Sequence, residues 1–205
     1  MELPKKDKNG NSYLSYSQIS LFKRDKEQYY KTYVINEPFK SNEYIEFGNK
    51  VGIALEKNNF CDFEERESKI LRKVTRLEHF EQPVFLRYEN FYVVGYVDTC
   101  SSDYTHIIDY KTGGKNKHIQ YTKEDYWQLP IYALAIRQGT GNIVSNAQIE
   151  FIERSGNLYY GEDLKVSDSQ PLVIDIDVSE DRLKYIYWEI PKLASQIEEF
   201  YLDRK

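Results

Sequence analysis

The sequence predicts a mixed α/β fold in which a central β-sheet is flanked by helices. Two observations lead to this prediction. Apolar residues recur at helical spacing between residues 18 and 79, and again towards the C-terminus. Between these regions, over residues 84–111, short apolar runs alternate with turn residues, which is typical of strands. The 205 residues, 40% of them hydrophobic, are enough for a sizeable core, so we expect residues 1–205 to form a single domain.

The chain is expected to begin with a flexible tail followed by helices. Residues 1–12 are polar and carry no apolar pattern, so we expect them to be loose. Ser15 or Ser17 can cap a helix that runs over about residues 18–33. Further helices, each with one apolar side, are expected over residues 43–57 and about 64–79.

An antiparallel meander is expected next. Strands are predicted over residues 84–88, 91–98 and 104–111. Glu89–Asn90 and Ser101–Asp103 supply the turns that join them.

The C-terminal third is expected to return to helices and strands. A helix over about residues 123–138 contains Pro130, which predicts a kink or a late start. Strands are expected over residues 145–153, 158–160 and 172–177. The chain should end in a helix over residues 179–205, capped by Ser179 and kinked or split at Pro191.

Composition excludes several classes of protein. No apolar run is long enough to cross a bilayer, and the N-terminus lacks the apolar stretch of a signal peptide. We therefore expect a cytoplasmic protein with no membrane partner. Cys61 and Cys100 are too few for a disulfide framework, for a four-thiolate zinc site or for an iron–sulfur cluster.

The net charge of −5 argues at first against a nucleic-acid partner. The acidity is concentrated at one end, however, because residues 142–205 carry a net charge of −6 and the rest of the chain carries +1. No acidic residue occurs from Tyr110 to Lys123, and a second basic stretch runs from Arg66 to Arg76. Either stretch is consistent with a solvated face or with a phosphate-binding surface.

Three charged residues of the meander point to metal chemistry. Asp98 ends one expected strand, and Asp109 and Lys111 lie two apart on the next, so these two share a face. If the strands pair, two carboxylates and an ammonium converge. Carboxylates with open positions suit Mg²⁺ or Mn²⁺, and a lysine can stabilise charge that develops on phosphorus. By itself, such a triplet is also typical of strand-end carboxylates neutralised by a lysine.

Four segments in a fixed order over residues 13–135 make the pattern more specific. They are residues 15–34, 47–56, 95–113 (Gly95-Tyr96-Val97-Asp98, then Ile107-Ile108-Asp109-Tyr110-Lys111) and 128–133 (Gln128 to Ala133, with Tyr132). In these segments the chain resembles the PD-(D/E)xK nuclease superfamily. The likeness is to its RecB-like branch, which includes phage exonucleases and CRISPR adaptation nucleases.

The resemblance implies a restriction-endonuclease-like core and a role for each matching residue. Asp98, Asp109 and the backbone carbonyl of Tyr110 would bind Mg²⁺ or Mn²⁺, and Lys111 would be the catalytic lysine. Gln128 and Tyr132, four apart and so on one helix face, would line the site near the scissile phosphate.

The sequence departs from the family pattern in one helix. A histidine that binds metal in many members falls at Gly52. Glu56, one turn further along the same face, is our candidate to replace it, or a water fills the gap. Gly48 lies four residues before Gly52, and two glycines on one face allow close backbone approach. Because only two cysteines are present, the cluster of many CRISPR-associated relatives is not expected.

These observations predict a metal-dependent DNA nuclease, an exonuclease rather than a sequence-specific endonuclease. It would bind single- or double-stranded DNA without reading sequence, in a bacterial or phage-infected cell, alongside a recombination or replication protein. The missing histidine motivates an alternative, a nuclease-fold protein with impaired catalysis that binds DNA or a recombination partner. A nuclease acting on RNA is a third hypothesis.

Overall fold

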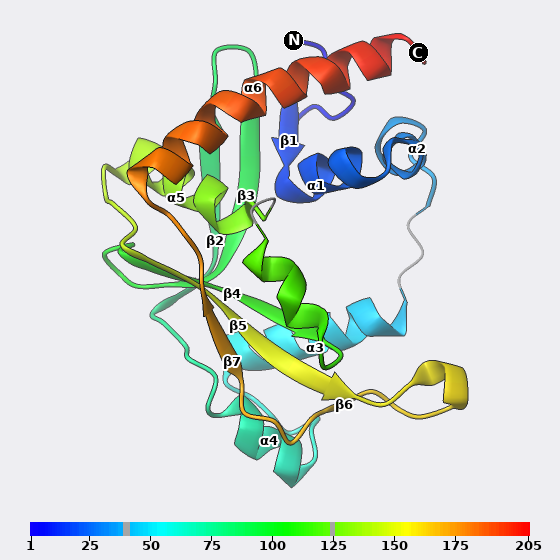
Figure 1. The fold of residues 1–205 in the computed structure, drawn as a ribbon, viewed down its shortest axis with the longest axis vertical. Helices are drawn as coiled ribbons and strands as arrows, with labels where there is room; N and C mark the ends of the chain where they lie inside the picture. The colour runs from blue at the N-terminus through cyan, green and yellow to red at the C-terminus, as the bar shows by residue number, and fades with distance from the viewer. Residues whose placement is uncertain (39–41, 124–125) are drawn as a thin grey trace.

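The computed structural model describes residues 1–38, 42–123 and 126–205. Within these residues seven strands form one mixed sheet flanked by helices, which confirms the predicted fold class (Figure 1). The strands are β1 (Tyr13–Ser15), β2 (His79–Arg87), β3 (Tyr92–Cys100), β4 (His106–Gly113), β5 (Asn146–Ser155), β6 (Lys165–Val166) and β7 (Leu172–Asp175). The helices are α1 (Tyr16–Arg24), α2 (Lys26–Tyr29), η1 (Tyr30–Val34), α3 (Glu43–Lys57), α4 (Glu65–Leu71), η2 (Lys117–Thr122), α5 (Gln128–Thr140), η3 (Leu158–Tyr160) and α6 (Glu180–Leu202).

The middle of the sheet contains the expected meander. Strands β2, β3 and β4 pair antiparallel in chain order. Strand β5 then pairs parallel to β4, so the chain must cross from one end of the sheet to the other, and α5 lies in that connection. Strand β1 pairs parallel to β3. Because β2 pairs with β3 along its whole length, β1 and β4 share the other edge of β3, with β1 at Tyr92–Val94 and β4 at Thr99–Cys100.

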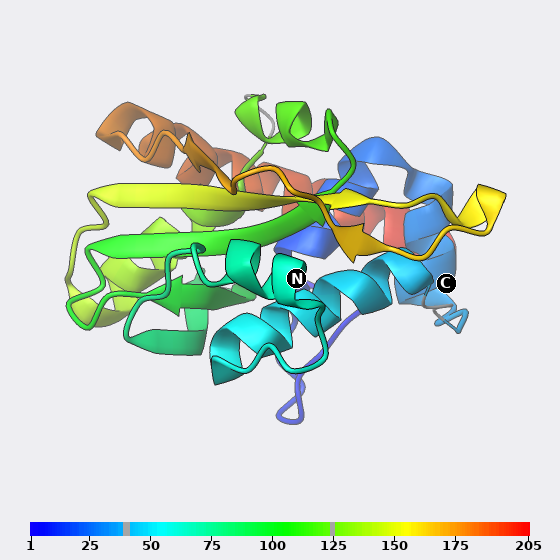
Figure 2. The same cartoon turned by 90° about the horizontal axis from the view of Figure 1, so that it is seen from below.

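Two apolar clusters cover the two faces of the sheet. The larger contains side chains of α1, α5 and α6, and the smaller contains side chains of α3 and α4. Neighbouring residues of β5 divide between them, because Phe151 belongs to the larger cluster and Ile152 to the smaller. Figure 2 shows α3 and α4 on one side of β4 and β5, and η2 and α6 on the other.

The first expected helix is three shorter ones. Ser15 caps α1 by accepting a hydrogen bond of 3.3 Å from the Gln18 N–H. At Asp25 the backbone turns to extended geometry, with φ of −155°, and Asp25 caps α2 in its turn. The helical spacing is preserved across this break, which is why periodicity alone does not reveal it.

The third expected helix is much shorter than predicted, because tertiary hydrogen bonds take over its second half. Helix α4 ends at Leu71. Beyond it, the N–H of Thr75 donates to the Glu150 carboxylate at 2.8 Å, and the N–H of Leu77 donates to the Thr99 hydroxyl at 3.1 Å. Strand β2 then begins at His79, five residues before the expected start.

Residues 1–12 are not the flexible tail that their polarity predicts. Leu3 is fully buried in the larger cluster, and its N–H donates to the hydroxyl of the buried Ser12 at 3.2 Å. The Ser12 hydroxyl also donates to the Met1 carbonyl at 3.1 Å, and the Tyr92 hydroxyl donates to the Asp7 carboxylate at 3.3 Å. A single apolar side chain and contacts between distant residues leave no pattern in the sequence.

The remaining differences concern short elements and prolines. Residues 158–160, expected as a strand, form the 3₁₀ turn η3, and the short strands β1 and β6 were not expected. Helix α5 starts late, at Gln128, so that Pro130 lies in its first turn, where a missing N–H costs nothing. Helix α6 continues through Pro191 and is not split there. In the described parts of the chain, every helix is too short or too polar to cross a membrane.

Candidate active site

Strands β3 and β4 pair over only two positions, Thr99 with Ile108 and Cys100 with Ile107, and then separate. In the gap, the Tyr110 N–H donates a hydrogen bond of 2.7 Å to the Asp98 carboxylate, which replaces the strand partner that the N–H lacks. The N–H and C=O of one residue in an extended strand point to the same side, so the Tyr110 carbonyl also faces this gap.

The Asp109 carboxylate is only 1% exposed and has three hydrogen-bond donors. The ammonium of Lys111 lies 2.5 Å from Oδ2, and the side-chain amide of Gln128 donates to Oδ1 at 2.7 Å. The hydroxyl of Tyr126 donates a weaker bond of 3.4 Å to Oδ2. Such a network fixes the carboxylate in one orientation, as a buried charge requires.

Helix α5 reaches the site through a close contact with β3. Gln128 donates a second hydrogen bond, of 3.1 Å, to the Tyr132 hydroxyl. The Tyr132 ring rests directly on Gly95 of β3, where a Cβ would overlap its atoms. Gly95 is therefore required by the contact that positions Tyr132, and through it Gln128.

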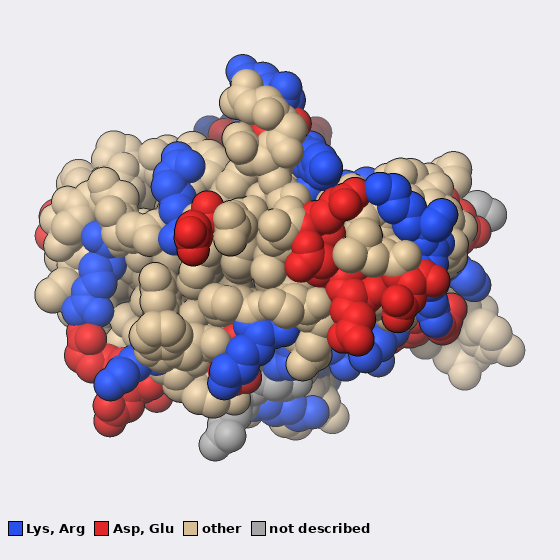
Figure 3. All heavy atoms as spheres, turned by 90° about the horizontal axis from the view of Figure 1, so that it is seen from above, with Lys and Arg blue, Asp and Glu red and all other residues tan. Residues whose placement is uncertain are grey.

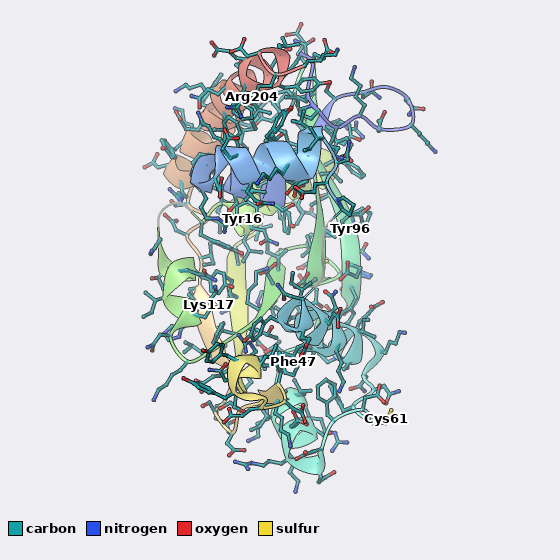
Figure 4. The ribbon with its side chains drawn as sticks, turned by 90° about the vertical axis from the view of Figure 1, so that its right-hand side faces the viewer. Tyr16, Phe47, Cys61, Tyr96, Lys117 and Arg204 are labelled. Atoms are coloured by element: carbon teal, nitrogen blue, oxygen red, sulfur yellow. The ribbon has the colours of Figure 1, made fainter. Side chains whose placement is uncertain are left out.

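A cleft of about 780 Å³ opens on the α3 side of this gap. Its wall includes Gly52 and Glu56 from α3, Glu81 from β2, and Asp98, Tyr110 and Lys111 from the meander. Helix α3 lies close to β4, since a Cβ at Gly48 would come within 3.2 Å of the Thr112 hydroxyl. In Figure 4, α3, with Phe47, and η2, with Lys117, lie on opposite sides of the strands.

Glu81 is a carboxylate of the cleft that sequence reasoning missed. The register of β2 and β3, with Phe80 opposite Thr99 and Gln82 opposite Val97, places Glu81 opposite Asp98. Glu81 has a φ of +49°, which a residue with a side chain rarely adopts. No sequence signal could have found it, because it precedes the apolar alternation of the strand.

Burial and neighbouring charge shift several pKa values in the site. Burial, and then the charge of Asp109, raises the pKa of Asp98 to about 7. Burial opposes the charged form of Lys111, but the Asp109 and Asp98 carboxylates outweigh it and hold its pKa above the ordinary value. Burial, and then Asp109, also raises the pKa values of Tyr126 and Tyr132, so both hydroxyls remain protonated donors.

The oxygen atoms around the gap suit a hard divalent cation. Among the described residues, no three His, Cys, Asp or Glu side chains are close enough to hold a metal ion. Two carboxylates, Asp98 and Asp109, and the Tyr110 carbonyl are the oxygen atoms at the gap, and such a set would suit a cation that keeps several waters. A cation there would offset the repulsion that raises the pKa of Asp98.

The residues singled out in the sequence occupy one region of the structure. Asp109, Lys111, Gln128 and Tyr132 are linked by hydrogen bonds or ion pairs, and Asp98 lies next to them on the diverging strand. Glu56 is exposed and lines the cleft together with Gly52. A Cβ at position 52 would meet no atom within 4 Å. Tyr126 is a further contact that sequence reasoning missed, since an isolated tyrosine before a helix has no recognisable pattern.

Comparison with known proteins agrees with this arrangement. Residues 53–201 match the family model of the PD-(D/E)XK nuclease superfamily. A crystal structure of a presumed exonuclease from Eubacterium rectale has a similar fold, with a TM-score of 0.64 at 12% sequence identity. The superposition covers 95% of this chain and 83% of that one, and it confirms the restriction-endonuclease-like core. No curated protein matches the sequence.

Proposed function

The chain belongs to the PD-(D/E)XK nuclease superfamily, and from this premise we propose that it is a metal-dependent exonuclease acting on DNA. One observation carries the proposal. The separation of β3 and β4 leaves Asp98, Asp109 and Lys111 around a gap beside an open cleft, where a phosphate can approach them. The four matching segments favour the RecB-like branch of the superfamily.

Each residue at the gap has a role that its contacts support. Asp98, Asp109 and the Tyr110 carbonyl would hold Mg²⁺ or Mn²⁺. When bound, such a cation activates a water and stabilises charge on phosphate oxygens. The raised pKa of Lys111 keeps its side chain as an ammonium, which can donate a hydrogen bond to a phosphate oxygen.

Gln128 and Tyr132 act as positioning residues in this proposal. Gln128 fixes Asp109, and Tyr132 fixes Gln128 while resting on Gly95. Holding the reacting groups in place contributes to rate, and small displacements are costly.

Glu56 is the proposed substitute for the family histidine, acting through a water because no three described carboxylates are close enough to share a metal ion. It lines the same cleft as Asp98, and its charge is close enough to raise the pKa of Glu81, after burial. Replacing Glu56 by Gln should therefore weaken the binding of Mn²⁺ without removing the Asp98–Asp109 site.

Support for the finer parts of the proposal is of different kinds. The E. rectale protein is a presumed exonuclease, which favours that mode here. The acid-free stretch from Tyr110 to Lys123 contributes cations next to the site, which favours a polyanionic substrate bound through its backbone. A recombination or replication protein as partner stays a prediction.

A cleavage assay tests the proposal. End-labelled linear and circular DNA, and RNA of the same sequence, are incubated with Mg²⁺, Mn²⁺ or EDTA. We expect linear DNA to be shortened from its ends with either metal and to survive in EDTA.

Three variants test the residues at the gap in the same assay. The cleavage rate should fall by about 10²- to 10³-fold or more in each of Asp98→Asn, Asp109→Asn and Lys111→Met, and it should not fall in the surface variant Asp203→Asn. Wild-type cleavage by Asp109→Asn would sink the assignment, and preferential cleavage of RNA would favour an RNA nuclease.

The glycine at position 52 is the observation that favours one alternative, a nuclease-fold protein that binds DNA or a recombination partner without cutting. The resemblance leads us to expect a histidine at this position of the cleft, and its imidazole is absent. Calorimetric titration with Mn²⁺ separates the two. No measurable metal site, together with no cleavage of linear or single-stranded DNA, would favour the binding protein.

A further inference from the structure

A second hollow, of about 490 Å³, lies beside the candidate active site, and Lys111 lines both. We call it the α1–η2 groove. Its wall includes Tyr16, Lys23, Arg24, Tyr121, Lys123 and Tyr126. In Figure 4, α1 with Tyr16 lies above β4 and β5, and η2 with Lys117 lies to one side of them.

The two hollows differ in charge. The α1–η2 groove is lined by four cationic side chains, and none of its described lining residues is acidic; the four are Lys23, Arg24, Lys111 and Lys123. The cleft on the α3 side has the opposite character, since its described lining residues include the acidic Glu56, Glu81 and Asp98 and a single cation, Lys111. The face seen from above in Figure 3 shows no such separation, because acidic and basic side chains lie there side by side. The groove therefore suits a polyanion, and the cleft a cation.

Three tyrosines add aromatic surface to the groove. Tyr16 and Tyr121 each pack edge-on against Tyr126, with ring centroids 5.7 Å and 5.6 Å apart. Tyr16 and Tyr121 remain half-buried, so part of each ring is accessible from the groove. Cations that follow a sugar–phosphate backbone, combined with aromatic rings, are the usual means of binding unpaired nucleotides.

The groove also leads to the residues that would act on the phosphate. Lys111 and Gln128 line it, and both contact the Asp109 carboxylate. A chain of phosphates that follows the groove therefore arrives at Asp109 from the side opposite the α3 cleft.

We infer that the α1–η2 groove binds an unpaired strand of the DNA substrate and leads it to Asp109 and Lys111. The inference rests on the proposed function, since it names the form in which the substrate reaches the site. A duplex is the less suitable ligand, because its paired bases are stacked on one another and offer no free face to Tyr16 or Tyr121.

Binding in EDTA tests the inference apart from catalysis. The probe is a fluorescent oligothymidylate of about 16 nucleotides, compared by anisotropy with a blunt duplex of equal length. In the variant Arg24→Ala/Lys123→Ala, we expect the Kd for the single strand to rise about tenfold or more. The slope of log Kd against log salt should fall by about 1.4, which is about 0.7 for each phosphate that the variant no longer neutralises.

A matched control removes two cations elsewhere. Lys57→Ala/Lys69→Ala makes the same change in net charge on α3 and α4, and no described residue of either helix lines the groove. We expect it to change the Kd for the single strand less than about twofold, because distant surface charges are screened by salt.

Variants of Tyr121 separate the contribution of base stacking to binding from that of charge. Tyr121→Phe keeps the ring and should bind the single strand like the wild type, whereas Tyr121→Leu should raise the Kd by about fivefold or more. Thermal unfolding shows whether each variant is folded, and the Arg24/Lys123 variant tests the groove without touching the packed rings.

Two results would overturn the inference. One is a single-strand Kd for Arg24→Ala/Lys123→Ala equal to that of the wild type. The other is tighter binding of the duplex than of the single strand by the wild type. The binding assay contains no metal, so its result does not depend on catalysis. A wild-type protein that binds the strand through the groove in EDTA, yet cleaves nothing with Mg²⁺ or Mn²⁺, would support this inference and refute the proposed function. Normal cleavage of DNA, together with a single-strand Kd that the groove variant does not change, would support the proposed function and refute this inference.

Discussion

The side-chain amide of Gln128, in the first turn of α5, donates a hydrogen bond of 2.7 Å to the buried carboxylate of Asp109 on β4. The bond joins the helix of the larger apolar cluster to the strand that carries Lys111. The Gln128 amide donates to Oδ1 of the Asp109 carboxylate, whereas the Lys111 ammonium contacts Oδ2, so each donor has its own oxygen. The position of α5 therefore determines how Asp109 is presented to the gap.

Replacing Gln128 by Met removes this donor at nearly constant length. We expect the affinity for Mn²⁺ to fall by about 10- to 100-fold, because residues that orient a metal-binding carboxylate contribute in this range. Isothermal titration calorimetry measures the affinity directly. Gln138→Met, on the same helix but bonded to the backbone of Arg87, is the matched control and should bind Mn²⁺ like the wild type. An unchanged affinity in Gln128→Met would contradict the positioning role.

Gly95→Ala should disturb the site through Tyr132. A Cβ at position 95 overlaps the Tyr132 ring, so the ring must move, and overpacking of this kind costs about 1–3 kcal/mol of stability. Chemical denaturation measures the change in the free energy of unfolding, and the cleavage rate should fall with it because Gln128 loses its partner.

A double-mutant cycle identifies the cause. With Tyr132→Ala as the background, Gly95→Ala should cost little, because the overlapping atoms are gone. An equal cost in both backgrounds would place the strain elsewhere.

The parts of the site that sequence could predict are those governed by local periodicity. Asp109 and Lys111 share a strand face because side chains alternate, and Gln128 and Tyr132 share a helix face because they are four apart. The gap itself was not predictable. It depends on β3 and β4 pairing only at Thr99 and Cys100 and lying apart at Asp98, which only their full register shows.

The residues that sequence reasoning missed are fixed by contacts between distant segments. Glu81 reaches the cleft through its position opposite Asp98, and Leu3 is buried by residues from the rest of the chain. The early end of α4 has the same origin, since Thr75 gives its N–H to Glu150 instead of continuing the helix. Local propensity carries no information on such pairings.

Stability should depend on pH through Asp98. Its pKa is about 7 in the folded protein, against an ordinary value of 3.8, so between these values the folded state binds a proton that the unfolded chain has released. Stability therefore falls as the pH rises from about 4 to about 7, and the favourable contribution is lost through the folded pKa. Thermal unfolding in EDTA should show this fall in the wild type.

Asp98→Asn supplies the comparison for that pH series. An amide cannot titrate, so the variant should lose the part of the pH dependence that belongs to Asp98. Saturating Mn²⁺ should reduce the fall in the wild type, since a bound cation favours the ionised carboxylate. Parallel pH curves for the two proteins would show that Asp98 titrates near its ordinary value.

Gly52→His tests whether α3 faces the metal as the family pattern implies. A Cβ at this position meets nothing within 4 Å, and position 52 lines the same cleft as Asp98, so there is open space in which a histidine can extend. An added imidazole suits Mn²⁺, and we expect its affinity to rise about tenfold or more in a calorimetric titration. Gly52→Leu fills similar space without a ligand and removes the same helix glycine, so it accounts for gains from helix propensity alone. If the His and Leu variants bind Mn²⁺ equally, this face of α3 does not reach the metal, and Glu56, one turn further along, loses its proposed role with it.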